Sequence, residues 1–308
     1  MTPVVIAGSA HPALGAAVAA AFGASAACNV KRFPDGELDV AVEGVAGRDV
    51  FVVQPLAAPI GEALLELVLI ADACRRSGAT AVSAVVPYLG YARQERRTRE
   101  GQPLGAKVVA RLVSEGGFAR VILVDLHAAA GEGFFATPVE HVTAVPLLAA
   151  ALASCSGDSV VVAPDLGAAK LARRLAATLK LPTAIVYKTR VSGNDVTAGE
   201  IVGAVRGLRP ILVDDMISTG GTIAEATSAV VAAGALPEVT VVATHGLFVG
   251  PASKRLRPLP IVRWIVTDTL PRQTTFLPLE LVTVAPLLAD TIRRVAEGRR
   301  LGAALAAT

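Results

Sequence analysis

Short apolar runs, rich in β-branched residues, recur along the chain and alternate with segments of helical period. These runs lie at residues 4–7, 50–53, 81–86, 121–124, 159–163, 184–187, 211–213 and 239–243. A strand that is apolar at every position, rather than at every second one, is typical of a sheet buried on both faces. The alternation with helices therefore predicts the α/β class, with doubly wound, mostly parallel sheets.

Apolar positions three and four apart mark the helices between these strands. The segment 62–76 places Leu65, Leu69 and Ala73 on one face, has arginines in its last turn, and is followed by Gly78. Cations in the last turn and a glycine just beyond it are typical of a helix end. Further helices are predicted from Pro12 onward and at residues 166–179, 222–233 and 286–296.

The tetrapeptide Ile-Leu-Val-Asp occurs twice, ending at Asp125 and at Asp214, and each copy leads into a glycine-containing loop. Either the chain contains an internal duplication, or two ordinary buried strands both end in a carboxylate. A length of 308 residues corresponds to about two domains at roughly 100–200 residues each. We expect two similar domains, residues 1–145 and 146–308, and leave open that the last helix packs on the first.

Composition narrows the class of protein. Hydrophobic residues make up 53% of the chain and charged residues 18%, which excludes a disordered or fibrous protein. A net charge of +3 without a long block of one sign argues against binding to nucleic acid. Residues 1–30 contain no Lys or Arg and are interrupted by Pro12. Neither a signal peptide nor a membrane anchor is therefore expected.

Cysteine usage indicates a reducing compartment. Cys28, Cys74 and Cys155 are far apart and form no Cys-x-x-Cys pair. Such spacing predicts neither a disulfide framework nor a cysteine zinc site. We therefore expect a cytoplasmic protein.

The strongest local signal follows the apolar run 211–213. Gly220 and Gly221 allow a ligand to approach the backbone closely, where the first N–H groups of the predicted helix carry positive partial charge. The hydroxyl groups of Ser218, Thr219 and Thr222 add further hydrogen-bond donors. Together these groups predict a phosphate-binding loop. No Lys follows the glycines, so the loop is not a Walker A motif.

Asp214 and Asp215 come directly before this loop. Adjacent carboxylates accept hydrogen bonds from sugar hydroxyls or hold a cation. The alternative interpretation is a plain glycine turn with an acidic surface end. Two acids, several hydroxyls and two glycines between a strand and a helix favour a binding site, because ligands of open α/β sheets bind beyond the carboxyl ends of strands.

The segment 213–222, VDDMISTGGT, resembles the phosphoribosyl-diphosphate-binding loop of the type I phosphoribosyltransferase fold. Other segments are similar to the ribose-phosphate diphosphokinase family: RFPDGE at 32–37, PYLGYARQ at 87–94, DLHA at 125–128 and PDLG at 164–167. The resemblance covers nearly the whole chain and implies two duplicated domains of phosphoribosyltransferase type. It also implies an enzyme that uses Mg²⁺ to move the β,γ-diphosphoryl group of ATP to the C1 hydroxyl of ribose 5-phosphate, releasing AMP.

The resemblance also implies the sugar-phosphate and catalytic residues. Asp214 and Asp215 would hold the ribose hydroxyls. The 5-phosphate would be bound by the loop residues Ser218, Thr219, Gly220, Gly221 and Thr222. Lys188 and Arg190, which follow the run 184–187, would be catalytic and stabilise the transferring group. On spacing alone this pair reads as the solvated end of a strand.

Nucleotide and metal ligands are implied in the same way. Arg93, Gln94 and His127 would contact ATP, and His127 and Asp165 would be the Mg²⁺ positions. ATP would also be bound by the turn residues Phe33, Asp35 and Glu37 of a neighbouring subunit. Taken without the resemblance, these segments are a solvated loop, a polar strand end and a good turn. The implied active form is a homo-oligomer, dimer or hexamer, with a nucleotide site shared between subunits.

Departures from the family pattern concern regulation and assembly. Gly101 and Gly78 stand where the phosphate-activated class has an arginine and a serine of its allosteric anion site, although Arg48 remains. A lost cation removes a charge-assisted hydrogen bond of about 1.5–3 kcal/mol. We therefore predict weak or absent phosphate activation and ADP inhibition. Ser218 replaces the usual acid, and residues 129–132 replace a glutamine-bearing stretch at a subunit contact.

Two other functions are considered. A catalytically silent regulatory subunit of such an oligomer would not need to retain Lys188, Arg190 and both loop aspartates. A nucleobase phosphoribosyltransferase would share the phosphate loop, but the YARQ and DLH segments would then have no explanation.

Overall fold

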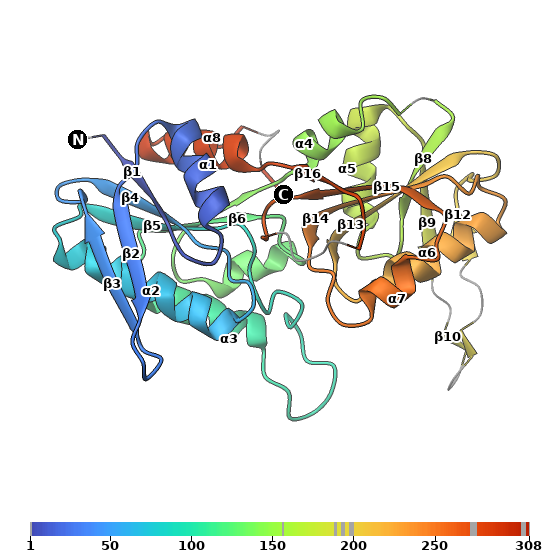
Figure 1. Cartoon of the computed structure of the whole chain (residues 1–308). Helices are drawn as coiled ribbons and strands as arrows, with labels where there is room; N and C mark the ends of the chain where they lie inside the picture. Colours follow the sequence, from blue (N-terminus) through green and yellow to red (C-terminus); the bar gives the residue numbers. More distant parts are fainter. Residues whose placement is uncertain are drawn as a thin grey trace. The chain divides into compact units, whose positions relative to one another are not determined.

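The computed structural model describes residues 2–155, 157–187, 190–191, 195–196, 200–271, 276–302 and 306–307 (Figure 1). The chain divides into two compact units by its internal contacts. The first unit comprises Met1–Thr143, Thr269–Pro271 and Thr283–Thr308, and the second comprises Ala144–Asp268 and Arg272–Val282. The last helix of the chain thus belongs to the first unit. Whether residues 1–145 and 146–308 act as separate domains stays a prediction.

The first unit is built on a parallel five-stranded sheet. In spatial order its strands are β1 (Val4–Ala7), β4 (Asp49–Val53), β5 (Ala81–Val86), β6 (Arg120–Val124) and β7 (Val139–Val142). Figure 1 shows helices on both faces of this sheet. One face carries α1 (Pro12–Phe22) and α8 (Ala285–Ala296), and the other carries α2 (Ile60–Arg76) and α3 (Gly105–Glu115).

Beside this sheet lies a two-stranded antiparallel ribbon, β2 (Ala27–Arg32) and β3 (Leu38–Glu43). Exposed and partly buried positions alternate along both strands. The partly buried side chains, Cys28, Val30, Val40 and Val42, pack against the core of the first unit. The ribbon therefore has one packed face and one face toward solvent, as is usual for antiparallel pairs.

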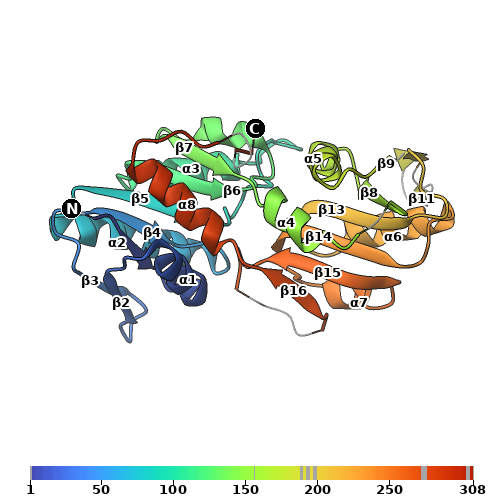
Figure 2. The same cartoon turned by 90° about the horizontal axis from the view of Figure 1, so that it is seen from above.

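Helices α1 and α8 lie side by side, as Figure 2 shows from above. The guanidinium of Arg293 lies 5.8 Å from the centre of the Phe22 ring and donates a hydrogen bond to the carbonyl oxygen of Ala21. A guanidinium over an aromatic face adds an electrostatic attraction to the apolar packing of the two helices. The two ends of the described chain thereby meet in one unit.

The second unit is built on a seven-stranded sheet. In spatial order its strands are β12 (Glu200–Val202), β9 (Thr183–Tyr187), β8 (Ser159–Ala163), β13 (Arg209–Ile217), β14 (Val239–Gly246), β15 (Ile261–Thr267) and β16 (Leu279–Val282). Strand β12 runs antiparallel to β9, and the other neighbours are parallel. A separate antiparallel pair joins β10 (Arg190–Val191) and β11 (Asp195–Val196).

Helices cover both faces of the second sheet as well (Figure 1). One face carries α4 (Val145–Ala151) and α5 (Ala169–Leu179), and the other carries α6 (Gly221–Ala232) and α7 (Ala252–Leu256). All five residues of β8 are buried. This explains the continuous apolar run there, since each large apolar side chain contributes about 1.5–3 kcal/mol when fully buried. The predicted α/β class with mostly parallel sheets is confirmed.

Among the described residues, every helix is too short or too polar to cross a bilayer.

Candidate active site

The carboxyl end of β13 carries both predicted aspartates. The strand was predicted to end at Val213, and this is wrong, because it continues to Ile217. Beyond Val213 the strand still pairs with β14, where Asp214 lies opposite Ala243 and Met216 opposite His245. Polar carboxylates in a central strand obscured this extension in the sequence. Asp214 and Asp215 therefore project from regular backbone rather than from a loop.

The turn after β13 leads directly into α6. Gly220 is the N-cap of this helix and has φ of +75°, a left-handed conformation that glycine adopts without steric cost. Its carbonyl oxygen accepts the hydrogen bond from the N–H of Ala224, 2.9 Å away. Since the N-cap is a glycine, no N-cap side chain occupies the first N–H groups of α6. Those donors can bind an anion.

Asp214 and Asp215 at the end of β13 and Asp165 after the neighbouring strand β8 lie near enough to interact electrostatically. The backbone N–H of Asp215 donates to Oδ1 of Asp214 over 2.9 Å. Burial, and then the charges of Asp215 and Asp165, raise the pKa of the Asp214 carboxyl well above its usual range. A bound cation, or hydroxyl donors, would stabilise the ionised form of this carboxyl.

Asp165 follows β8 at the same edge of the sheet. Its Oδ1 accepts a hydrogen bond of 3.2 Å from the N–H of Ala168, just before α5. The carboxylate is thereby held in a fixed position beside the end of β13. The part of the chain described here has no group of three or more His, Cys, Asp or Glu side chains that could hold a metal ion.

In the first unit, the loop after β6 carries His127. Asp125 has φ of +37°, which is strained for a residue with a side chain, and its N–H donates to the carbonyl oxygen of Val142 over 3.0 Å. The next N–H, of Leu126, donates to Nε2 of His141 over 2.8 Å. These two bonds to β7 hold the strained turn. His127 itself is exposed.

His141 was not singled out in the sequence. Its Nδ1 lies 2.6 Å from Oε1 of Glu132, in the short helix Ala129–Phe134. Because Nε2 accepts from Leu126, Nδ1 carries the proton and donates it to the Glu132 carboxylate. The only signal in the sequence was the unusual stretch 129–132, and nothing there indicated a partner on β7.

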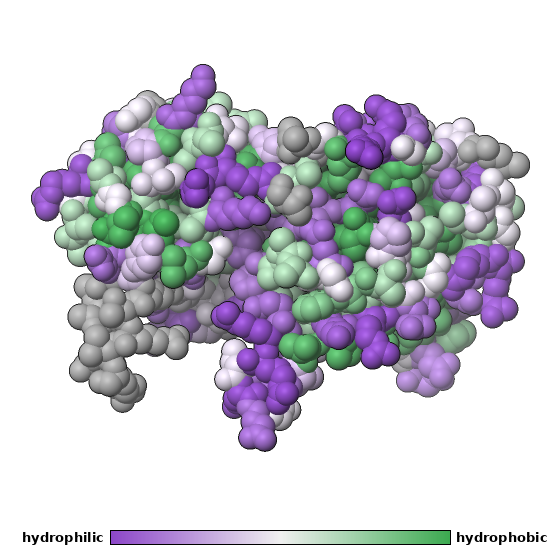
Figure 3. All heavy atoms as spheres, turned by 180° about the vertical axis from the view of Figure 1, so that it is seen from behind, coloured by the Kyte–Doolittle hydropathy of each residue, from purple (hydrophilic) through white to green (hydrophobic). Residues whose placement is uncertain are grey.

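The loop between β5 and α3 carries Arg93 and Gln94. Tyr91 has φ of +65°, and its carbonyl oxygen accepts from the N–H of Gln94 over 2.8 Å. The Gln94 side chain lies against Gly105 at the start of α3. This loop also exposes further arginines, Arg96, Arg97 and Arg99. Figure 3 shows a strongly hydrophilic projection where Figure 1 places this loop.

The turn of the ribbon β2–β3 carries Phe33, Asp35 and Glu37. The N–H of Phe33 donates to the carbonyl oxygen of Glu37 over 2.8 Å, and the N–H of Glu37 donates to Oδ1 of Asp35 over 3.1 Å. Phe33 is 50% exposed, which is unusual for an aromatic side chain in a tight turn. These side chains are thus available at the end of the ribbon.

The predicted catalytic pair is only partly placed. Lys188 lies outside the described residues. Arg190 begins β10 and is opposite Val196 in the register with β11. Of the other predicted site residues, the second unit brings together Asp165, Asp214 and the loop 218–222. The first unit holds Arg93, Gln94 and His127 on loops that follow the carboxyl ends of β5 and β6, while Phe33 lies on the ribbon.

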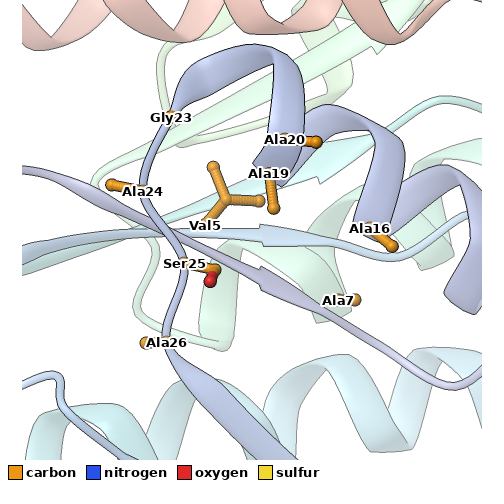
Figure 4. Close-up of a pocket in the computed structure, with 9 residues that line it drawn as sticks. All are labelled: Val5, Ala7, Ala16, Ala19, Ala20, Gly23, Ala24, Ser25 and Ala26. Atoms are coloured by element: carbon orange, nitrogen blue, oxygen red, sulfur yellow. The ribbon is translucent and has the colours of Figure 1, made fainter.

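A pocket of about 520 Å³ in the first unit lies elsewhere (Figure 4). It is lined by β1, by the alanines of α1 and by the segment after that helix. Of the nine lining residues, Ser25 alone has a polar side chain. Such a lining offers neither charge nor a group for acid–base chemistry, so this pocket is not the candidate active site.

Comparisons with known proteins cover both units. Residues 3–117 match the family model described as the N-terminal domain of ribose phosphate pyrophosphokinase, and residues 143–262 match the phosphoribosyl transferase domain. The chain is 40% identical over 300 residues to a ribose-phosphate pyrophosphokinase of Caldanaerobacter subterraneus subsp. tengcongensis, covering 96% of this chain and 95% of the relative. It is 42% identical over 274 residues to that of Bacillus caldolyticus, covering 88% and 87%.

A solved structure agrees with these relatives. The crystal structure of phosphoribosylpyrophosphate synthetase from Mycobacterium smegmatis aligns with a TM-score of 0.88 and 38% identity. The alignment covers 97% of this chain and 100% of that chain.

Proposed function

The chain belongs to the ribose-phosphate pyrophosphokinase family and is an enzyme of phosphoribosyl diphosphate synthesis, and we propose how its residues carry out the reaction. The β,γ-diphosphoryl group of ATP passes to the C1 hydroxyl of ribose 5-phosphate, and AMP leaves. The observation that carries this proposal is the end of β13, where two aspartates precede a glycine N-cap that opens α6.

The sugar phosphate binds at the β13–α6 turn. The 5-phosphate accepts hydrogen bonds from the first N–H groups of α6 and from the hydroxyls of Ser218, Thr219 and Thr222, with Gly220 and Gly221 allowing close approach. Asp214 and Asp215 accept hydrogen bonds from the ribose hydroxyls. These contacts fix the direction of the C1 hydroxyl, and such positioning is a large part of catalysis in phosphoryl transfer.

A divalent cation, Mg²⁺, fits the negative charge around Asp214. Burial and the nearby carboxylates Asp215 and Asp165 raise the pKa of the Asp214 carboxyl, and a bound cation would stabilise its ionised form. Asp165 and His127 would hold the ion, which would neutralise charge on the ATP phosphates. Mg²⁺ uses few protein carboxylates when phosphates complete its shell, so a dense acidic cluster is not required.

ATP binds to residues of the first unit and of a neighbouring subunit. The guanidinium of Arg93 pairs with phosphate oxygens, and Gln94 and His127 add hydrogen bonds. The exposed Phe33 stacks on the adenine of ATP bound to the adjacent subunit, while Asp35 and Glu37 accept hydrogen bonds from its edge. The active form is then a homo-oligomer, dimer or hexamer. Lys188 and Arg190 stabilise the charge that develops on the transferring group.

A cytoplasmic location suits this enzyme. The three cysteines are free thiols, which agrees with a reducing compartment. The relatives named above are bacterial, which agrees with this location, although some plant relatives are named chloroplastic.

The test is formation of AMP and phosphoribosyl diphosphate from ATP. With Mg²⁺ and ribose 5-phosphate, the purified protein should release both products in equal amounts, and omission of the sugar phosphate should stop AMP release. A silent regulatory subunit would release neither product. A nucleobase phosphoribosyltransferase would consume phosphoribosyl diphosphate with a free base and ignore ATP. Either of these results would refute the proposal.

A further inference from the structure

The short helix α7 lies against the phosphate-binding turn, although the two are far apart in sequence. Nη1 of Arg255 donates a hydrogen bond of 3.3 Å to the carbonyl oxygen of Thr219. A Cβ atom on Gly220 would lie 2.8 Å from Cγ of Leu256, and one on Gly221 would lie 3.4 Å from Nη1 of Arg255. Two adjacent residues of α7 therefore contact three consecutive residues of the turn.

The bond from Arg255 fixes one peptide group of the turn. In a trans peptide the carbonyl oxygen and the following N–H point in opposite directions. With the Thr219 carbonyl directed at Arg255, the N–H of Gly220 points away from α7. Gly220 has φ of +75°, so this peptide plane lies at the point where strand backbone changes to helix. A glycine peptide without this bond has more conformations available.

The turn has no cation of its own. Residues 214–222 contain two aspartates and neither Lys nor Arg. Asp165 adds a third carboxylate near Asp214. A sugar phosphate dianion therefore approaches a region of negative charge. The guanidinium of Arg255 is a cation that lies directly against the backbone of the turn, so it offsets part of this repulsion.

We infer that Arg255 is a positioning residue for the 5-phosphate of the sugar substrate. It acts through the Thr219–Gly220 peptide, which it holds with one N–H directed toward the phosphate, and its charge lowers the local negative potential. This inference rests on the proposed function of the turn. It concerns the affinity for the sugar phosphate and leaves the nucleotide site unchanged.

The test compares Arg255 with its neighbour. Arg255→Met keeps a long apolar stem and removes both the charge and the donor, and Arg255→Lys keeps the charge. Lys254→Met is the matched control, because Lys254 is also exposed, lies on the same helix, and has no contact with the turn among the interactions of the described residues. Initial rates give KM and kcat for each substrate. Titration calorimetry with ribose 5-phosphate gives affinity without turnover.

Arg255→Met should raise KM and Kd for ribose 5-phosphate about tenfold, as expected when one hydrogen bond to a charged group is lost. The KM for ATP should stay unchanged, and Arg255→Lys should recover part of the affinity. Lys254→Met should behave as wild type. The inference is wrong if both methionine variants have the same Kd, or if Arg255→Met lowers kcat and leaves Kd intact.

The calorimetry separates this inference from the proposed function. A wild type that binds ribose 5-phosphate but transfers nothing from ATP would refute the proposed reaction alone. If Arg255→Met does not fold, the Arg255→Lys variant decides, because it retains a long cationic side chain but lacks the planar fork that donates to Thr219. A Kd for Arg255→Lys equal to wild type would then overturn the role assigned to this bond.

Discussion

Nδ1 of His141 and Oε1 of Glu132 lie 2.6 Å apart, and the opposite ring nitrogen of the same histidine accepts the N–H of Leu126. The carboxylate fixes the tautomer, and the tautomer fixes which backbone group the ring can hold. His141 is therefore connected to the residue directly before His127. A substitution at His141 reaches the proposed nucleotide site without touching a ligand.

For His141→Ala we expect a loss of stability of about 1–3 kcal/mol, because the Leu126 N–H loses its acceptor next to the strained Asp125. Turnover should fall by about tenfold or more as the position of His127 is lost. Denaturant unfolding and kcat measure the two effects. Glu132→Gln keeps an acceptor oxygen for Nδ1–H and should change both values little. Equal losses in both variants would contradict the role given to the tautomer.

Gly220→Ala tests the turn itself. A Cβ atom there meets Leu256 at 2.8 Å, and φ is +75°. We expect a loss of about 1–2 kcal/mol from the left-handed backbone alone, plus the cost of the steric overlap. Gly207→Ala is the control, because φ is +72° and its Cβ would have nothing within 4 Å. Only Gly220→Ala should raise the KM for ribose 5-phosphate. If the KM for ribose 5-phosphate rises equally in both variants, the effect is not specific to this turn, and the binding role given to the turn geometry is wrong.

Lys188→Ala should lower turnover by several orders of magnitude, while the affinity for ATP changes far less. The reason is that a cation over the transferring group acts mainly in the transition state. Single-turnover rates and equilibrium ATP binding distinguish the two effects. If ATP affinity falls as far as turnover does, Lys188 is a ground-state binding residue instead.

Inorganic phosphate should have little effect on the initial rate. By the resemblance, Gly101 and Gly78 stand where the family's anion site has an arginine and a serine, and both have positive φ, +79° and +83°. A larger side chain would be strained at either position, so the missing groups have no simple substitute there. A titration of phosphate at fixed substrates measures this. Strong activation would show that Arg48 and its neighbours retain an effector site.

The thiols should resist alkylation at pH 8. Burial, and for Cys28 also the nearby Glu66, raises the pKa of Cys28 to about 11; burial raises that of Cys74 to about 12. A raised thiol pKa means that the reactive thiolate is scarce until the pH approaches that value. Mass spectrometry after iodoacetamide treatment should show little modification of the native protein and complete modification in guanidinium. Rapid modification of native Cys28 would contradict this.

The sequence predicted best those strands whose burial makes nearly every position apolar. Residues 81–86 and 159–163 are apolar except for one serine each because their strands are almost fully buried, and β5 and β8 have those bounds. The ribbon β2–β3 was missed. Its strands alternate between exposed and partly buried positions, and the polar residues between them obscured the pattern. Helix α3 was missed because its start lies close to a charged loop.

The site could be predicted only where its residues are adjacent in sequence. The turn 218–222 was found because two aspartates, hydroxyls and two glycines follow one strand. Arg255 and His141 were not found, since each acts through a backbone group distant in the chain, Thr219 and Leu126 respectively. The residues next to each in the sequence give no sign of its role, because its backbone partner is determined by strand order and helix packing.

The packing of α8 on α1 has a consequence for the nascent chain. All residues of the second unit are translated after α1 and before α8. The side of α1 that α8 covers must therefore remain open to solvent, or to a chaperone, while the whole second unit is made. Strand β1 is translated before the second unit, yet the unit to which it belongs is completed only after it.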